Sequence, residues 1–105
     1  MSIFRKKPKQ PKNELKSVIF TDCTLKSLTE KDTEAVLRLI DYSDSILDIR
    51  FHGVSRILND DPVGDREIMD VSFHWNGDTW IINLRNDDGE TVLELTYENA
   101  DLCWC

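Results

Sequence analysis

The side chains of this 105-residue chain whose types could support chemistry are three cysteines, two histidines and two acidic runs. Cys23 paired with an outward-facing His74 would bring a thiol and a base together, but no nucleophile motif surrounds any cysteine. The C-terminal Cys-Trp-Cys (103–105) offers metal-ligand types without the Cys-x2-4-Cys and His-x3-5-His spacing of common zinc sites. The sequence therefore predicts no catalytic residue and no metal site.

The acidic runs "NDDPVGD" (59–65) and "NDDG" (86–89) resemble fragments of calcium loops. Neither continues to the bidentate Glu that completes the EF-hand pattern, and Asn, Asp and Gly are the ordinary residues of tight turns. The chain has no Gly-rich phosphate loop, nucleophile elbow or dinucleotide fingerprint. We therefore expect two turns and no cofactor.

Apolar and polar residues alternate along much of the chain, a pattern typical of β-strands with one buried face. Such strands would position the side chains named above. Residues 70–95 predict three strands joined by turns at 76–78 and 86–89. The apolar positions predicted to face inward are Met69, Val71, Phe73, Trp75, Trp80, Ile82, Leu84, Leu93, Leu95 and Tyr97.

Further strands are predicted upstream and downstream. Residues 46–52 alternate between inward Leu47, Ile49 and Phe51 and outward Asp48, Arg50 and His52. Gly53 predicts a bulge or bend, after which Val54, Ile57 and Leu58 return to the core. Residues 17–22 predict a short strand, and residues 100–105 a last one with Leu102 and Trp104 on one side.

Residues 30–42 are compatible with two structures. Thr29 and Asp32 resemble a capping box, and Ala35, Val36, Leu39 and Ile40 could share a helical face. Read as a strand, Leu37 and Leu39 alternate with polar neighbours, and we favour the strand. The fold class expected is mainly β, an antiparallel meander of six to eight strands forming a small sandwich or open barrel, with one short helix near residues 30–42 as the open alternative.

Charge divides the chain into two parts. Residues 1–16 hold six basic residues and one acid, a charge of +5, whereas residues 17–105 hold seven basic and nineteen acidic residues, a charge of -12. We expect a flexible basic tail over 1–16 and a single antiparallel β domain over 17–105. Such an acidic body repels nucleic acid and favours basic partners.

The N-terminus shows no apolar signal run, and no segment approaches the roughly 20 apolar residues of a membrane span. We therefore expect a cytoplasmic protein without a transmembrane segment, whose cysteines remain thiols. Its oligomeric state is not readable from the sequence.

The succession "VIFTDCTLKSL", "VLRLIDYSDSILDIRFHGV" and the acidic hairpins resembles small acidic β-rich immunity proteins of bacterial contact-dependent and polymorphic toxin systems. The resemblance covers size, acidity and strand layout over residues 17–105. It implies a non-enzymatic protein that binds and neutralises a cognate toxin domain, often a basic nuclease.

Complementary charge gives this function a physical basis, because acids steer an inhibitor onto a Lys- and Arg-rich substrate groove. The outward face of the meander would carry the contacts, with Ile81 and Val92 as its apolar centre. The residues expected to bind the partner are Asp70, His74, Asp78, Ile81, Asp87, Asp88, Glu90 and Glu94.

Two other functions fit the same sequence. A phage-type inhibitor or nucleic-acid mimic acting on a bacterial defence nuclease would use the same acidity. A small ligand-binding or enzymatic β-barrel would instead need an internal pocket lined by groups with shifted pKa values.

Overall fold

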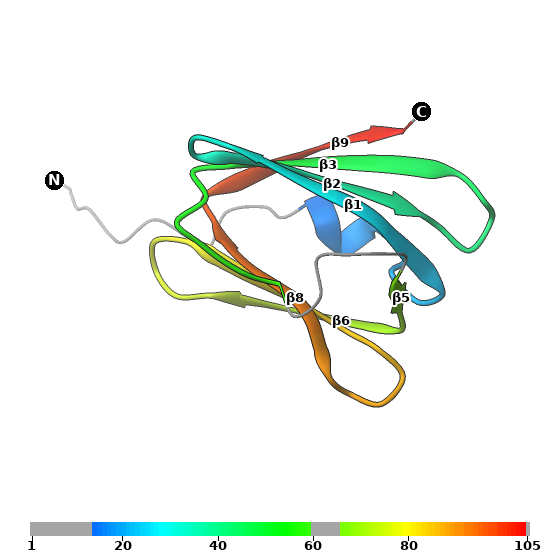
Figure 1. Cartoon of the computed structure of the whole chain (residues 1–105). Helices are drawn as coiled ribbons and strands as arrows, with labels where there is room; N and C mark the ends of the chain where they lie inside the picture. The colour runs from blue at the N-terminus through cyan, green and yellow to red at the C-terminus, as the bar shows by residue number, and fades with distance from the viewer. Residues whose placement is uncertain (1–13, 60–65, 105) are drawn as a thin grey trace, which may run out of the picture.

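Two antiparallel sheets lie face to face in the computed structural model, which describes residues 14–59 and 66–104 (Figure 1). One sheet has five strands in the order β5-β1-β2-β3-β9, and the other has four in the order β4-β8-β7-β6. The elements of the described residues are η1 Glu14–Ser17, β1 Cys23–Lys31, β2 Glu34–Ile40, β3 Ile46–His52, β4 Arg56–Asn59, β5 Arg66–Ile68, β6 Asp70–Trp75, β7 Trp80–Arg85, β8 Thr91–Tyr97 and β9 Asn99–Trp104. The mainly β class and the sandwich expected from the sequence are confirmed. Nine strands are described where six to eight were expected, and β4 and β5 are the shortest.

The predicted meander is present as β6, β7 and β8. Strand β7 pairs with β6 on one side and with β8 on the other, both antiparallel. Trp80, Ile82 and Leu84 alternate inward on β7, as period-two counting predicts. The first turn is closed by Asn76, whose Oδ1 accepts the backbone N–H groups of Asp78 and Thr79 at 3.0 and 2.9 Å. Turn chemistry therefore accounts for the Asn at this position.

Residues 30–42 form a hairpin, and the strand interpretation of this segment is confirmed. The end of β1 pairs with β2, with Lys31 opposite Glu34. The two-residue turn places Asp32 at φ +54°, a left-handed conformation that Asp tolerates better than most residues. The helical alternative fails because burial on β2 follows a period of two, with Ala35, Leu37 and Leu39 inward.

The strand predicted over residues 17–22 is absent, and that prediction was wrong. The segment instead follows the 3-10 turn η1, where the Val18 amide donates to the Leu15 carbonyl at 3.1 Å. It reaches β1 through a turn closed by the Cys23 amide and the Phe20 carbonyl, also 3.1 Å apart. Apolar side chains here fill the interior without pairing the backbone, which period counting cannot distinguish from a strand.

Leu15 also moves the predicted boundary of the folded part. Its side chain is completely buried, and the Lys16 ammonium lies 5.3 Å from the centre of the Trp80 ring. Leu15 and Lys16 therefore pack with the β domain, although the sequence assigned them to the tail. The rest of that tail, residues 1–13, lies outside the described residues, and so does most of the turn predicted at "NDDPVGD", residues 60–65.

The sheets are joined at a bend where two hydrogen-bonded strands change sheets together. Strand β3 pairs with β9 in one sheet, while their chain neighbours β4 and β8 pair with each other in the second. At the bend the Glu98 amide donates to the His52 carbonyl at 2.9 Å. Gly53 stands there at φ +64°, so the bend expected at this glycine is present. Beyond it Val54 and Ile57 pack against the core as predicted, whereas Leu58 does not: its side chain is exposed.

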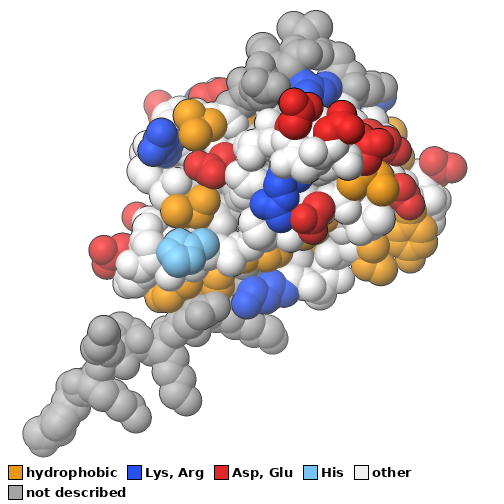
Figure 2. Space-filling model, turned by 90° about the horizontal axis from the view of Figure 1, so that it is seen from below, with side chains coloured by type: hydrophobic (Ala, Val, Ile, Leu, Met, Phe, Trp, Pro, Cys, Tyr) orange, Lys and Arg blue, Asp and Glu red, His pale blue; other side chains and the backbone are white. Residues whose placement is uncertain are grey.

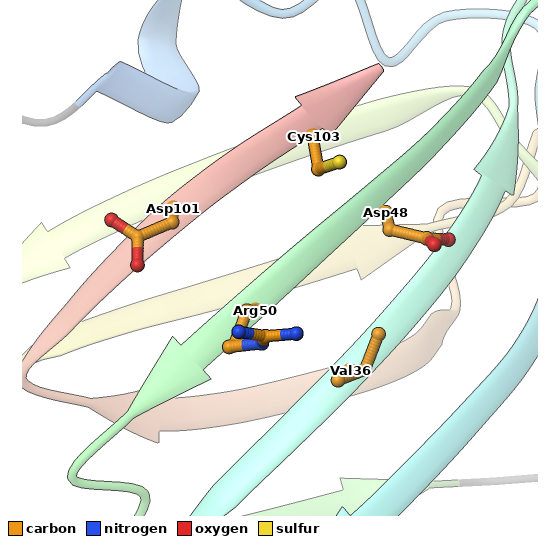
Figure 3. Close-up of a pocket in the computed structure, with 5 residues that line it drawn as sticks. All are labelled: Val36, Asp48, Arg50, Asp101 and Cys103. Carbon is orange, nitrogen blue, oxygen red and sulfur yellow. The ribbon is translucent and has the colours of Figure 1, made fainter. Parts of the chain in front are cut away.

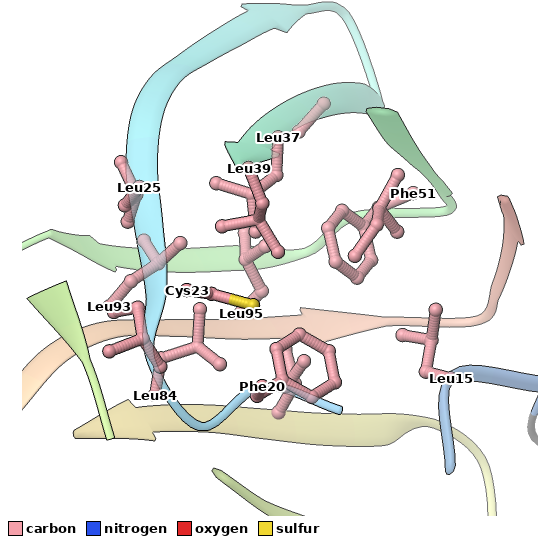
Figure 4. Packing of buried hydrophobic residues seen from close by; sticks show 14 of the residues in the cluster. Leu15, Phe20, Cys23, Leu25, Leu37, Leu39, Phe51, Leu84, Leu93 and Leu95 are labelled. Atoms are coloured by element: carbon pink, nitrogen blue, oxygen red, sulfur yellow. The ribbon is translucent and has the colours of Figure 1, made fainter. Parts of the chain in front are cut away.

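The core lies between the sheets and is built almost entirely from inward strand positions (Figure 4). Figure 4 shows Leu25, Leu37 and Leu39 of the five-stranded sheet facing the same interior as Leu84 and Leu95 of the four-stranded one. Among the described residues no polar or charged residue is buried. Burial of these apolar faces is therefore what holds the sheets together. In the same residues, no helix has the length and apolar character needed to cross a membrane.

Replacing Gly53 tests the bend. Gly53→Ala should lower the free energy of unfolding by roughly 1–2 kcal/mol, because an L residue at positive φ costs about that much. A Cβ at Gly53 would also lie 2.6 Å from the Glu98 side chain, which has to move. Gly89→Ala is the matched control, since φ is +82° and no atom lies within 4 Å of its added Cβ. Urea unfolding measures both.

Any excess loss in Gly53→Ala over Gly89→Ala reports the contact with Glu98 and should disappear in a Glu98→Ala background. An unchanged midpoint for Gly53→Ala would contradict the bend.

Replacing Leu15 tests whether η1 belongs to the domain. Leu15→Ala removes a completely buried side chain and should cost about 2–5 kcal/mol in urea unfolding. Ile19→Ala, four residues on and 57% exposed, should change stability by no more than about 0.5 kcal/mol. Equal, small losses for both variants would show that η1 contributes nothing to the core.

Candidate functional site

The outer surface of the four-stranded sheet carries four of the eight residues predicted to bind a partner, and the other four lie in the turns that join its strands (Figure 2). We call this surface the four-strand face. Its outward side chains, in register across β4, β8, β7 and β6, are Arg56, Leu58, Glu94, Thr96, Ile81, Asn83, Arg85, Asp70, Ser72 and His74. Figure 2 shows acidic side chains crowding one part of this side of the molecule, with basic and apolar side chains between them.

The eight predicted residues do not form one patch. Asp78 lies in the β6–β7 turn, whereas Asp87, Asp88 and Glu90 lie in the β7–β8 turn. Consecutive turns of an antiparallel meander fall at opposite ends of the shared strand, so the six residues of β7 separate them by roughly 20 Å. His74 and Ile81 pair with each other near the first turn.

Asp70 and Glu94 lie toward the second turn, and both carboxylates already have polar partners. Arg85 donates to Asp70 Oδ2 from Nη2 at 2.6 Å and from Nε at 3.2 Å. The Arg85 guanidinium, followed by the Val71 amide that donates to Asp70 Oδ1, holds the pKa of Asp70 below its usual range. Glu94 accepts a hydrogen bond from Asn83 Nδ2 at 2.9 Å. These two acids stabilise the sheet surface locally and are less available to a partner.

Val92 is not part of the four-strand face, contrary to prediction. Leu84 pairs with Leu93 but Arg85 pairs with Thr91, so Val92 is the extra residue of a bulge. The bulge turns Val92 inward, where it is completely buried beside Leu93. Period-two counting placed it outward because a bulge shifts the alternation by one residue.

Leu58 supplies the apolar side chain that Val92 was expected to provide. It is 43% exposed and stands opposite Glu94 on the neighbouring strand. Sequence reasoning placed Leu58 inward after Gly53. On β4 the side chains of Arg56 and Leu58 point outward and that of Ile57 points inward. This alternation could be predicted only if the register of β4 against β8 were known.

The β7–β8 turn concentrates the uncompensated negative charge. Asn86 Oδ1 accepts hydrogen bonds from the backbone N–H groups of Asp88 and Glu90, each at 3.0 Å. The backbone N–H of Asn86 donates to the Glu90 carbonyl at 3.0 Å. These bonds fix the backbone of residues 86–90, which we call the acidic turn. Its Asp87, Asp88 and Glu90 side chains are exposed, and within residues 14–59 and 66–104 none of them forms an ion pair.

The outer surface of the five-stranded sheet has a different charge arrangement. Arg38 on β2 donates to both carboxylate oxygens of Asp48 on β3, at 2.8 and 2.9 Å. His52 on β3 lies between Glu34 on β2 and Asp101 on β9, at 3.1 and 2.8 Å. Opposite charges thus alternate across neighbouring strands and compensate one another.

A shallow hollow of about 180 Å³ lies on the same surface, lined by Val36, Asp48, Arg50, Asp101 and Cys103 (Figure 3). Cys103 is exposed there, and none of the residues that line the hollow is a histidine. The hollow therefore lacks the imidazole base that would activate a thiol. Asp101 lies 49 positions from His52 in sequence, so no local motif could have revealed their contact.

The other conceivable thiol–histidine pair is not formed. Cys23 is completely buried and donates its S–H to the Ile19 carbonyl at 3.1 Å, whereas His74 lies exposed on the four-strand face. Burial, with the negative charges of Asp41 and Asp22, raises the pKa of the Cys23 thiol to about 11. Cys23 is a core side chain, not a nucleophile.

Metal binding finds no site in the described part of the chain. No group of three or more His, Cys, Asp or Glu side chains is placed there to hold an ion. Of the calcium-like runs, "NDDG" forms the Asn86-centred turn, while most of "NDDPVGD" lies outside the described residues.

Comparison with protein-family models, curated proteins and solved structures finds no match to this chain. Function therefore has to be inferred from the arrangement of its own side chains. The clearest asymmetry is between the acidic turn, whose carboxylates form no ion pair with the described residues, and strands β2, β3 and β9, where Arg38 pairs with Asp48 and His52 lies between two carboxylates.

Cysteine reactivity tests the role assigned to Cys23. In a variant carrying Cys103→Ser and Cys105→Ser, Cys23 is the remaining thiol. At pH 8 its raised pKa and burial should make it react with a disulfide reagent at least 100-fold more slowly in the folded protein than in urea. Absorbance of the released thiolate measures the rate. Equally fast reaction in both conditions would show that Cys23 is accessible and ionised.

Proposed function

We propose that this protein is a non-enzymatic binding protein of the immunity type, which neutralises a basic toxin domain by covering its substrate surface. The acidic turn is the observation that carries the proposal. Three exposed carboxylates, Asp87, Asp88 and Glu90, are held on a backbone fixed by Asn86 and have no cationic partner in the described residues. A rigid, uncompensated anionic loop suits a partner that supplies Lys or Arg.

Long-range electrostatics favour the same kind of partner. The charge of -12 over residues 17–105 attracts a basic surface and speeds association, most strongly at low salt. A nuclease-type toxin offers such a surface, because its substrate groove has to attract phosphates. Exposed ion pairs contribute only about 0.2–1 kcal/mol each, so affinity needs an apolar contact as well.

Leu58 is the best candidate for that contact. It stands on the four-strand face beside Glu94, on the side of the sheet where β8 leads back to the acidic turn. A patch of about 800 Å² per partner is usual for a stable complex and would extend from the acidic turn over Leu58 toward Ile81. Asp78 and His74, at the far end of the face, would then lie at the rim.

An enzymatic function has less support. Cys23 is buried, both ring nitrogens of His52 face carboxylates, and the interior between the sheets is apolar. A phage-type inhibitor of a defence nuclease would use the same acidic turn. The two inhibitory functions differ in the target, which the following experiment identifies.

The test is to coexpress the protein with the product of its neighbouring gene and to measure association rates at low and moderate salt. Asp87→Lys with Asp88→Lys should slow association by about tenfold or more at low salt and flatten its salt dependence, because the pair reverses charge on the acidic turn. Circular dichroism should show an unchanged fold.

Glu30→Lys with Glu67→Lys is the matched control, since it changes the net charge equally on strands β1 and β5 of the other sheet. Equal slowing by both pairs would remove the acidic turn from the interface. If the protein bound no basic product of a neighbouring gene at either salt concentration but did bind a defence nuclease, the proposed target would be that nuclease and not a toxin.

A further inference from the structure

His52 joins three neighbouring strands at one end of the five-stranded sheet. Its Nδ1 lies 3.1 Å from Glu34 Oε2 on β2, and its Nε2 lies 2.8 Å from Asp101 Oδ2 on β9. Glu34 is directly opposite His52 in the β2–β3 register, and Asp101 lies diagonally across on the edge strand β9. We call this arrangement the His52 clamp.

The clamp needs a proton to form fully. A neutral imidazole donates from one nitrogen and carries a lone pair on the other, and a carboxylate only accepts. Both ring nitrogens of His52 face carboxylates. A neutral His52 can therefore donate to only one carboxylate, while the lone pair of its other nitrogen points at the second carboxylate and repels it. An imidazolium donates to both, and each bond is then assisted by charge.

We propose that the His52 clamp is a pH-sensitive lock on edge strand β9, closed when His52 is protonated and loosened when it is neutral. Among the described strands β9 pairs with β3 alone, and its inward Ala100 and Leu102 are only partly buried, so the contact at Asp101 adds to its attachment. The lock is independent of the function proposed for the acidic turn, which lies on the other sheet.

The two carboxylates beside the ring favour the proton, and a cation stands opposite each of them. Glu34 faces the ring from β2 and Asp101 faces it from β9, while Lys31 on β1 stands opposite Glu34 and Arg50 on β3 stands opposite Asp101. The hydrogen bond to Asp101 raises the pKa of His52 most, partial burial opposes the rise, and the bond to Glu34 adds to it.

A raised pKa in the folded state fixes the direction of the pH effect. The stabilisation is fully present below the unfolded pKa of about 6.5 and is lost as pH rises through the folded pKa. The attachment of β9 by the His52 clamp therefore weakens as the pH becomes alkaline.

Hydrogen exchange and NMR titration test the lock in the full chain. The imidazole carbon signals of His52 should titrate above pH 6.5. For each unit by which the folded pKa exceeds the unfolded one, the protection factors of β9 amides should be approximately tenfold higher at low pH than at high pH. Protection factors, corrected for intrinsic exchange, are compared at pH 5.5 and 9 for β9 and for the β6–β7 hairpin, which should not change.

Three variants separate protonation from packing. His52→Gln keeps a polar side chain without the proton and should abolish the pH dependence of β9 protection. Asp101→Asn should lower the pKa of His52 and reduce that dependence, whereas His74→Gln, on the other sheet, should leave it intact. A His52 that titrates at or below 6.5, or β9 protection that is equal at both pH values in the wild-type protein, overturns the lock.

Discussion

The bend at Gly53 and Glu98 is the constraint on which the arrangement of the two sheets depends. Two strands that are hydrogen-bonded to each other leave one sheet and enter the other side by side, joined where the Glu98 amide meets the His52 carbonyl. The sheets cannot slide past one another without breaking this ladder. The apolar interior therefore forms against a fixed register, and each outer surface receives a defined set of side chains.

Sequence periodicity predicted the regular parts of this fold well. On β3 and β7, alternation alone identified the buried positions, because a strand with one wet face must bury every second residue. It failed where the backbone departs from that rule: Val92 is turned inward by a bulge, and Leu15 and Phe20 are buried from irregular backbone. Bulges and packed loops depend on tertiary contacts that a single sequence does not display.

The candidate site was predictable to a lesser degree. The turn that carries Asp87, Asp88 and Glu90 could be predicted, because Asn, Asp and Gly are typical turn residues. That these acids lie far from Asp78 follows only from the antiparallel order of β6, β7 and β8. Leu58 and the His52 clamp require strand register across distant segments. The two outer surfaces consequently differ in a way that composition conceals: on the five-stranded sheet Asp48 and His52 have partners of opposite charge on neighbouring strands, whereas the four-stranded sheet ends in a turn whose described carboxylates have none.

The contact between Asp70 and the Val71 amide bears on self-association. Strand β6 is an edge of its sheet, and such edges invite pairing with another chain. Asp70 Oδ1 accepts the Val71 N–H at 2.9 Å, which occupies a donor that an added strand would use, and places a carboxylate beside it. At this position the contact disfavours the pairing of a further strand with β6, whose inward Phe73 and Trp75 are only half-buried.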